Sequence, residues 1–226
     1  MGMQLHKNRI VGVLLVLQAV VYISFLVADC FFAGLGLFST FTKYLGILLC
    51  LAIAILLRRG AWSKRDSVLL ISALFFTCIA DLFLLLLNRP ITGLLFFCVV
   101  HLVYIRRYRP RLFYPAAAAA LAVMAGCLTA GRLVPGFPIA QVMACLYCVL
   151  IATVTVCGFL SPLPRTNRRL VNTGMVLFLL CDVHVALFNV LDASNPYFPF
   201  AAFFMWFFYL PSQVALALSG YCYEVS

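Results

Sequence analysis

The sequence predicts an all-α polytopic membrane protein, an eight-helix transmembrane bundle that forms one domain over residues 1–226. Hydrophobic residues make up 66% of the 226 residues and charged residues only 10%. A soluble domain has about 45–50% apolar and about 25% charged residues. A membrane span takes about 20 residues, so the chain has room for seven or eight helices and for no additional soluble domain.

Eight apolar runs follow one another along the chain, separated by charged or turn-forming residues. Seven of them are long enough to span a membrane as helices. The fourth is short for a perpendicular span, and Pro90 marks the tight turn that leads into it. The runs are 10–28, 38–57, 68–87, 91–105, 112–131, 139–160, 170–190 and 200–221.

The net charge of +10 is distributed as a topology signal. Basic residues cluster between runs, as in the cytoplasmic loops of membrane proteins, so we expect contact with membrane lipids and no nucleic acid. With the N-terminus inside, 13 of the 16 Lys and Arg residues lie on inner segments, and only Lys43, Arg89 and Arg132 lie near the outer side. Seven helices would break this alternation, so we predict eight, with both termini cytoplasmic. The inner residues are Lys7, Arg9, Arg58, Arg59, Lys64, Arg65, Arg106, Arg107, Arg109, Arg111, Arg165, Arg168 and Arg169.

Two aspartates, Asp81 and Asp182, stand alone inside runs that are otherwise apolar. An ionisable side chain at membrane depth costs at least about 2.5–3.5 kcal/mol on insertion scales, so such residues usually have a function. Interhelical hydrogen bonding is the other interpretation. It is weak for the two aspartates together, because Asn would give the same bonding without ionising. We therefore take both as the candidate catalytic residues.

The third and seventh runs carry similar polar residues at a constant offset of 101 positions. Ser72, Asp81 and Asn88 correspond to Thr173, Asp182 and Asn189. This order predicts a possible four-plus-four pseudo-repeat, an arrangement known in membrane proteins. Chance matching of small polar residues in Leu-rich helices is the alternative, and the sequence leaves both open.

Other polar residues fall on helix faces at similar depths. Thr77, Asp81 and Asn88 share one face at 3.6 residues per turn, and Pro211 can bend the last helix and free a carbonyl. We place the two aspartates roughly 18–20 Å from the inner ends of their helices, and expect one cavity, although separate interhelical hydrogen bonds would account for single residues. The candidate orienting or substrate-binding residues are Lys43, Asn88, His101, Tyr104, Asn189, Tyr209 and Gln213.

The remaining polar and sulfur-containing residues receive simpler interpretations. We expect Asp29, Asp66, Asp192 and Glu224 to lie at span ends or in loops with solvated roles, and His184 to serve packing. The ten cysteines include a Cys-x-x-Cys stretch at 145–148, which lies inside a predicted span and points to helix packing. Because no His, Cys and carboxylate cluster has ligand spacing, we expect no metal, and we expect no cofactor.

Several motifs together resemble the YhhN family of transmembrane lysoplasmalogenases. They lie in the family's order along essentially the whole chain. Two departures are Ala80, where the family usually has Gly, and Cys181, where it usually has Ser. The motifs are Thr42-Lys43, Ala80-Asp81-Leu-Phe-Leu-Leu-Leu, Gly93-Leu-Leu-Phe-Phe, His101-Leu-Val-Tyr104, Cys181-Asp182 and Tyr209-Leu-Pro-Ser-Gln213.

The resemblance implies hydrolysis of the vinyl ether bond of lysoplasmalogen-type lysophospholipids. Such a bond is cleaved when an acid protonates its β-carbon and water captures the resulting oxocarbenium ion. This chemistry needs one carboxyl group kept neutral by an apolar site and one carboxylate, and Asp81 and Asp182 supply the pair in either order. Lys43 and Arg89 are candidates to receive the lipid phosphate. We expect the plasma membrane of a bacterium as the location.

A small proton- or cation-coupled transporter is the competing class, because intramembrane acids also serve ion pathways. Against it, the runs lack the Gly- or Pro-interrupted centres common at transport sites, Pro211 excepted. A non-catalytic lipid-binding or scaffold protein is a third class, in which Asn would replace either aspartate without loss. The sequence gives neither the head group nor the oligomeric state.

The predicted topology can be checked with reporter fusions. A fusion after Ser226 should report the cytoplasmic side, and a fusion within 192–197 should report the outer side, because the basic residues lie on inner segments. An outer signal from the fusion after Ser226 would contradict eight spans with both termini inside.

Overall fold

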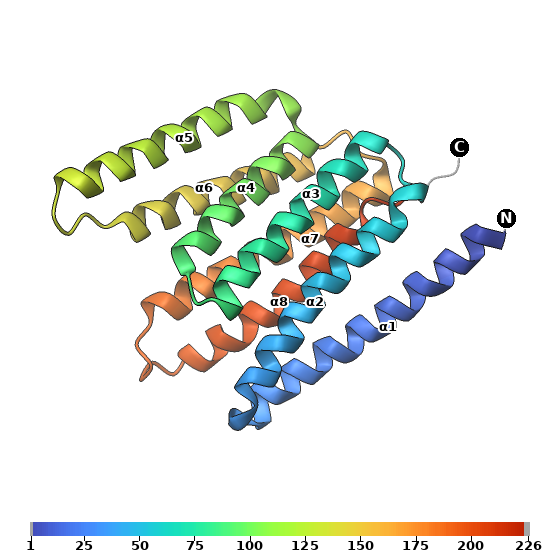
Figure 1. The fold of residues 1–226 in the computed structure, drawn as a ribbon, viewed down its shortest axis with the longest axis horizontal. Helices are drawn as coiled ribbons and strands as arrows, with labels where there is room; N and C mark the ends of the chain where they lie inside the picture. The colour runs from blue at the N-terminus through green and yellow to red at the C-terminus, as the bar shows by residue number, and fades with distance from the viewer. Residues whose placement is uncertain (1, 224–226) are drawn as a thin grey trace.

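The computed structural model describes residues 2–223, which form eight long helices joined by short connections (Figure 1). Each helix is long and apolar enough to cross a membrane, so the predicted all-α eight-helix fold is confirmed. Three short segments adjoin them: 3-10 turns at Ala33–Leu35 and Arg58–Gly60, and a π-helical segment at Leu82–Leu86. The helices are α1 (Gly2–Phe31), α2 (Gly36–Leu57), α3 (Lys64–Asp81), α4 (Pro90–Tyr108), α5 (Pro110–Leu133), α6 (Ile139–Phe159), α7 (Arg165–Val190) and α8 (Phe198–Leu218).

Several helices extend past the apolar runs that predicted them. α3 begins at Lys64 and α7 at Arg165, four and five residues earlier than expected, and α4 continues three residues further, to Tyr108. The added turns at these three ends are helical but carry charged side chains, so hydropathy does not include them in the predicted apolar runs. Pro90 and Pro110 occupy the first positions of α4 and α5, where the missing N–H of proline costs no hydrogen bond.

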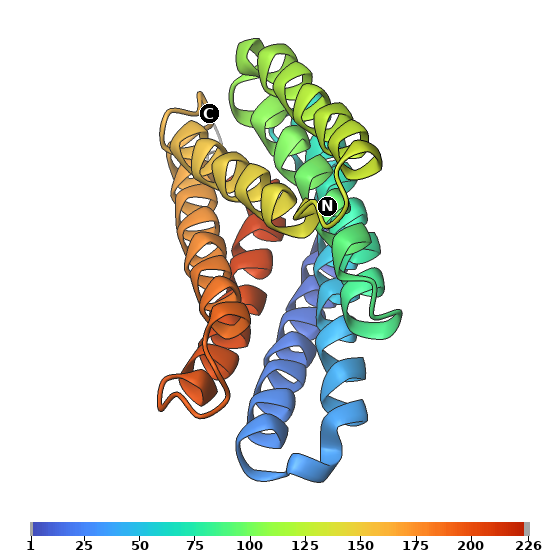
Figure 2. The same ribbon diagram turned by 90° about the vertical axis from the view of Figure 1, so that its left-hand side faces the viewer.

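The helices pack largely in chain order, and further contacts join the two halves of the chain. α2 lies against α8, and α4 lies against α6 (Figures 1 and 2). α5 is peripheral and contacts α4 and α6, and the residues it buries are Ala120 and Cys127. In a membrane, most of the α5 surface therefore faces lipid.

Two glycines allow helices to approach closely. A Cβ at Gly93 of α4 would lie 2.5 Å from the Leu84 side chain and 3.0 Å from the Ala80 carbonyl oxygen. A Cβ at Gly174 of α7 would lie 2.7 Å from the Leu216 side chain. Small residues at such contacts are typical of membrane helix pairs. They hold α4 against the end of α3 and α7 against α8.

Pro211 inside α8 frees a carbonyl, as expected from the sequence. Proline has no N–H to donate to the carbonyl four residues earlier, which here belongs to Phe207. The Tyr22 hydroxyl of α1 donates a 2.8 Å hydrogen bond to that carbonyl oxygen. The interruption in α8 therefore becomes a point of attachment for α1.

The predicted pseudo-repeat has partial support in the helix contacts. In a four-plus-four repeat, α1 corresponds to α5, α2 to α6 and α4 to α8. The α2–α8 contact then corresponds to the α6–α4 contact, and α1–α8 to α5–α4. All four contacts occur. Asp81 and Asp182 each lie 17 residues after the first residue of their helix, about 25 Å along the axis. This depth exceeds the expected 18–20 Å because both helices begin earlier. The π-helical segment after Asp81 interrupts the correspondence, since α7 is continuous. The repeat stays a prediction.

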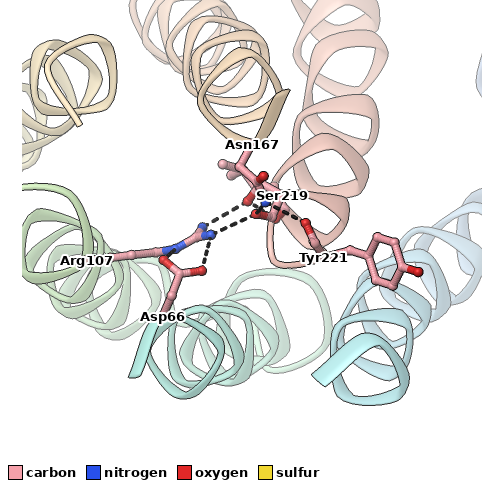
Figure 3. A network of polar contacts seen from close by, with 6 residues as sticks. Asp66, Arg107, Asn167, Ser219 and Tyr221 are labelled. Carbon is pink, nitrogen blue, oxygen red and sulfur yellow. Dashed lines mark hydrogen bonds and ion pairs between the residues drawn. The ribbon is translucent and has the colours of Figure 1, made fainter. Parts of the chain in front are cut away.

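A buried ion pair ties the ends of several helices together at one end of the bundle (Figure 3). Arg107 of α4 donates to both carboxylate oxygens of Asp66 of α3, at 2.7 and 2.8 Å, and its Nη1 donates to the Ser219 hydroxyl at 3.0 Å. The Arg107 and Asp66 side chains are 0% and 4% exposed. The prediction of a solvated role for Asp66 is therefore wrong. Sequence alone placed Asp66 at a span end or in a loop, because it lies before the apolar run 68–87.

The same region fixes the segment that follows α8. Asn167 of α7 donates from Nδ2 to the carbonyl oxygens of Ser219 and Tyr221, at 2.8 and 2.6 Å. The Cys222 N–H donates to the Gly60 carbonyl at 2.8 Å. Side chains from α3, α4 and α7 thus meet the end of α8 at one polar junction.

Replacing Arg107 should test this junction. Arg107→Met leaves the Asp66 carboxylate buried without its partner, and breaking a buried pair in this way costs about 3–5 kcal/mol. We expect a loss of that size in the free energy of unfolding, measured in detergent. Asp66→Leu combined with Arg107→Met should recover much of it. Arg106→Met, one residue earlier and exposed, is the matched control, and an equal loss there would contradict a special role for the buried pair.

Candidate functional site

Asp81 ends α3 and is held by a tyrosine from α8. The Tyr209 hydroxyl donates a 2.6 Å hydrogen bond to Asp81 Oδ2. Asp81 is 2% exposed and Tyr209 is 4% exposed, so the pair is buried. Tyr209 was predicted as an orienting residue, and the structure brings it directly to the carboxyl group.

A π-helical segment begins immediately after Asp81, at Leu82–Leu86. The Leu87 N–H bonds to the Leu82 carbonyl five residues back, at 3.0 Å, which is the π pattern. The wider turn breaks the register on which the predicted Thr77, Asp81 and Asn88 face depended. Asn88 follows it with φ +48° and is exposed. Single π turns in helices are frequent at functional sites.

Asp182 is held in a similar way by a tyrosine that sequence reasoning missed. The Tyr147 hydroxyl of α6 donates a 2.7 Å hydrogen bond to Asp182 Oδ2. Tyr147 lies on the buried face of α6 with Met143, Leu150 and Val154, at spacings of four, three and seven residues. A hydroxyl on that otherwise apolar face was the available signal.

Aromatic rings connect the two Asp–Tyr pairs. The Phe97 ring of α4 contacts both tyrosine rings, with centroids 6.1 Å from Tyr147 and 6.4 Å from Tyr209. Phe178 of α7 lies 5.6 Å from Tyr209 and 5.3 Å from the His101 ring, and His101 lies 5.0 Å from Tyr147. Both aspartates therefore border one buried cluster of rings. Their approach to within roughly 4–9 Å of each other around a shared cavity stays a prediction.

Several predicted orienting residues reach this region with polar atoms that have no protein partner. They are both ring nitrogens of His101, the Tyr104 hydroxyl and Gln213 Oε1, all on side chains that are 0% exposed. Gln213 Nε2 donates to the neighbouring Ser212 hydroxyl at 3.3 Å. An unpaired buried polar group costs about 1–3 kcal/mol, so such groups mark places where water or a ligand binds.

Lys43 lies apart from the aspartates, beside Asp29 near the end of α1 and Trp206 of α8. Its Nζ is 2.7 Å from Asp29 Oδ2 and lies 4.5 Å from the centroid of the Trp206 ring. The Ser39 hydroxyl donates to the other oxygen of Asp29 at 2.5 Å. The prediction that Asp29 is merely solvated is therefore wrong, because this carboxylate balances the charge of Lys43.

Two residues of the last turns of α7 do not join the cluster. Asn189 is exposed and donates to the Val185 carbonyl of its own helix at 2.7 Å. His184 contacts the Leu180 carbonyl, at 2.7 Å, and the rings of Phe204 and Phe208, which fits the packing role expected for it.

One surface hollow of the protein lies at the end of the bundle where basic residues gather. It has a volume of about 390 Å³ and is lined by Arg58, Arg59, Ala61 and Lys64. Within residues 2–223, no three His, Cys, Asp or Glu side chains gather as a ligand set. Cys145 and Cys148 are exposed thiols on α6, which faces lipid there.

The fold and the buried polar cluster together define an integral, multi-pass α-helical membrane protein with ionisable groups at membrane depth. The chain belongs to the YhhN family, whose family model matches residues 38–220. The matched segment contains both aspartates and both tyrosines that bind them. No curated protein and no solved structure matches the chain.

Replacing the two tyrosines tests the two tyrosine–aspartate hydrogen bonds through stability, without an assay of any reaction. Tyr147→Phe and Tyr209→Phe each remove the donor from a buried carboxyl oxygen, and we expect each to lower the free energy of unfolding by about 1–3 kcal/mol. Tyr114→Phe on α5, where the ring is 73% exposed, should change nothing. Unfolding in detergent is the measurement, and an unchanged stability for both buried variants would contradict the two hydrogen bonds.

Proposed function

We propose that this chain is a membrane-embedded ether hydrolase that cleaves the vinyl ether bond of lysoplasmalogen-type lysophospholipids. The observation that carries the proposal is the pair of intramembrane carboxyl groups, each bound by a tyrosine hydroxyl beside one cluster of rings. Membership of the YhhN family, whose members are known as lysoplasmalogenase-like, supports the substrate class.

The reaction divides between the two carboxyl groups. One aspartate, neutral in its apolar surroundings, gives its proton to the β-carbon of the vinyl ether, and an oxocarbenium ion forms. The other, as carboxylate, stabilises this cation and takes a proton from the attacking water. The resulting hemiacetal breaks its C–O bond and passes its hydroxyl proton to the departing oxygen. The products are a fatty aldehyde and a glycerophospho-base, and the proton count balances.

The tyrosine bonds would orient the carboxyl groups for these steps. Each hydroxyl donates to Oδ2, which leaves Oδ1 of Asp81 and of Asp182 to hold or receive the moving proton. The apolar rings between the two carboxyl groups would keep bulk water away from the oxocarbenium ion, so that only an oriented water molecule attacks it. His101, Tyr104 and Gln213 would orient that water, because the His101 ring nitrogens, the Tyr104 hydroxyl and Gln213 Oε1 have no partner on the protein.

Lys43 would meet the lipid phosphate near the outer ends of the helices. Its ammonium group is held between Asp29 and the Trp206 ring, so a phosphate group would share it with Asp29. Arg89 is exposed in the turn before α4 and is the second candidate. Asn88 and Asn189 are exposed near the same ends of α3 and α7, where they would contact the head group and not the bond being cleaved.

The orientation in the membrane follows from charge and helix number. We infer that both termini are cytoplasmic and that the protein lies in the plasma membrane of a bacterium. An even number of spans places the N- and C-termini on the same side of the membrane. The basic segments lie on that side too, which favours the cytoplasmic side for it.

Isosteric replacement of each aspartate tests the mechanism. Asp81→Asn and Asp182→Asn should each abolish aldehyde release from a lysoplasmalogen by purified protein in detergent, because general acid–base groups are worth about 10²–10⁴-fold each. Tyr104→Phe and Gln213→Ala should cost less, since water can partly restore orientation. Asp192→Asn, in an exposed loop, is the matched control.

The same assay separates hydrolysis from transport. Full activity in either Asn variant would remove the paired mechanism. A wild-type protein that binds protons or cations through these aspartates, but releases no aldehyde, would identify a transporter instead.

A further inference from the structure

Contacts connect α4 with α8 and the residue that follows it at two points, one near the aspartates and one at the opposite end of the bundle. At the end near the aspartates, the Phe97 ring of α4 lies 6.4 Å from the Tyr209 ring of α8. At the inner end, Arg107 of α4 donates to the Ser219 hydroxyl that follows α8, at 3.0 Å. Phe97 and Arg107 are ten residues apart, about 15 Å along the helix. These two contacts mark the two ends of the strip that lies between them.

Polar side chains without protein partners line this strip. His101, Tyr104 and Tyr108 follow one another on α4 at spacings of three and four residues, so they share one face. Gln213 of α8 lies one turn from Tyr209 on the facing helix. These four side chains are 0% exposed and carry five of the nine buried, unpartnered polar atoms in the described part of the chain.

The order of the polar groups along the strip is continuous. Tyr108 lies next to the inner junction, where the Arg107 guanidinium carbon is 5.5 Å from the centroid of its ring. The Tyr104 ring stacks on the Tyr108 ring with centroids 5.7 Å apart, and His101 is one turn further along α4. The His101 ring contacts Tyr147, which donates to Asp182. On the facing helix, Gln213 leads to Tyr209, which donates to Asp81.

Buried polar groups in proteins are almost always hydrogen-bonded, and those without a protein partner usually bind ordered water. Scattered single exceptions would indicate local misfit. Here the unpartnered atoms are consecutive on one helix face, and donors and acceptors are both present: hydroxyls, ring nitrogens and an amide oxygen. A chain of water molecules satisfies all of them together.

We propose that the strip between α4 and α8 binds a file of water molecules that runs from the Arg107–Asp66 pair at the inner end to the tyrosines of Asp81 and Asp182. The file would end at the charged junction, where Arg107 donates to both carboxylate oxygens of Asp66. The file would be a water-binding site distinct from any lipid site.

The use of this file by the enzyme rests on the proposed function. Vinyl ether hydrolysis consumes one water per lipid: its oxygen bonds to the cationic carbon, one proton restores the catalytic acid, and the other leaves with the alcohol product. The lipid reaches the aspartates from the membrane, an apolar route. A polar file from the inner side would deliver water to the same carbon without opening the site to bulk solvent.

Radiolytic hydroxyl-radical footprinting of the purified protein tests the file without any substrate, because a buried side chain is labelled when water is bound beside it. Tyr104 and Tyr108 should be labelled several-fold faster than Phe25, which is also 0% exposed but lies among the rings of Tyr22 and Trp206. Labelling of both tyrosines no faster than Phe25 would overturn the proposal.

A variant tests whether the water is continuous. Tyr108→Phe should lower the labelling of Tyr104 severalfold and slow aldehyde release, whereas Tyr114→Phe on the lipid-facing α5 should alter neither. Unchanged Tyr104 labelling in Tyr108→Phe would show separate sites and overturn the file. Strong labelling in a wild-type protein that releases no aldehyde would leave the file standing and reject the hydrolase.

Discussion

The structure depends on one constraint: inside a bilayer, a polar group must find its partner within the protein, because lipid tails supply none. The constraint acts at every point where the chain departs from a plain apolar helix. The Phe207 carbonyl freed by Pro211 is bonded by Tyr22, and the Asp66 carboxylate by Arg107. The first bond joins the first and last helices, α1 and α8, and the second joins the neighbouring helices α3 and α4. The polar exceptions therefore help to set the arrangement of an otherwise apolar bundle.

Sequence was sufficient for the helices because apolar length is the dominant signal in a membrane chain. It failed at helix ends such as Lys64 and Arg165, where charged turns remain helical, and at the π-helical segment after Asp81, which hydropathy does not detect. That segment also removed Asn88 from the face predicted for it. A register argument over eleven residues assumes an unbroken α-helix, and one wider turn is enough to invalidate it.

The candidate site was predictable where a polar residue stood out against an apolar background, as Asp81, Asp182 and Tyr209 do. Partners that arrive from other helices were harder to find. Tyr147 resembles any aromatic residue of an apolar span until α6 is placed against α7, and Asp29 resembles a loop residue until α1 is placed against Lys43. These partners are brought together by the packing of different helices. The periodicity of a single sequence predicts the face of one helix, but not which helix packs against it.

Under the proposed function, the first helix has a consequence for how lipid head groups would be discriminated. The family match begins at residue 38, whereas the carboxylate that neutralises Lys43 belongs to α1, before that segment. The electrostatic potential offered to a lipid at the outer rim is therefore set by a helix outside the segment that defines the family. Two chains identical from residue 38 onward, but differing at position 29, would present either a neutral pair or an uncompensated cation. Selectivity for head-group charge can thus change without any alteration of the aspartate site.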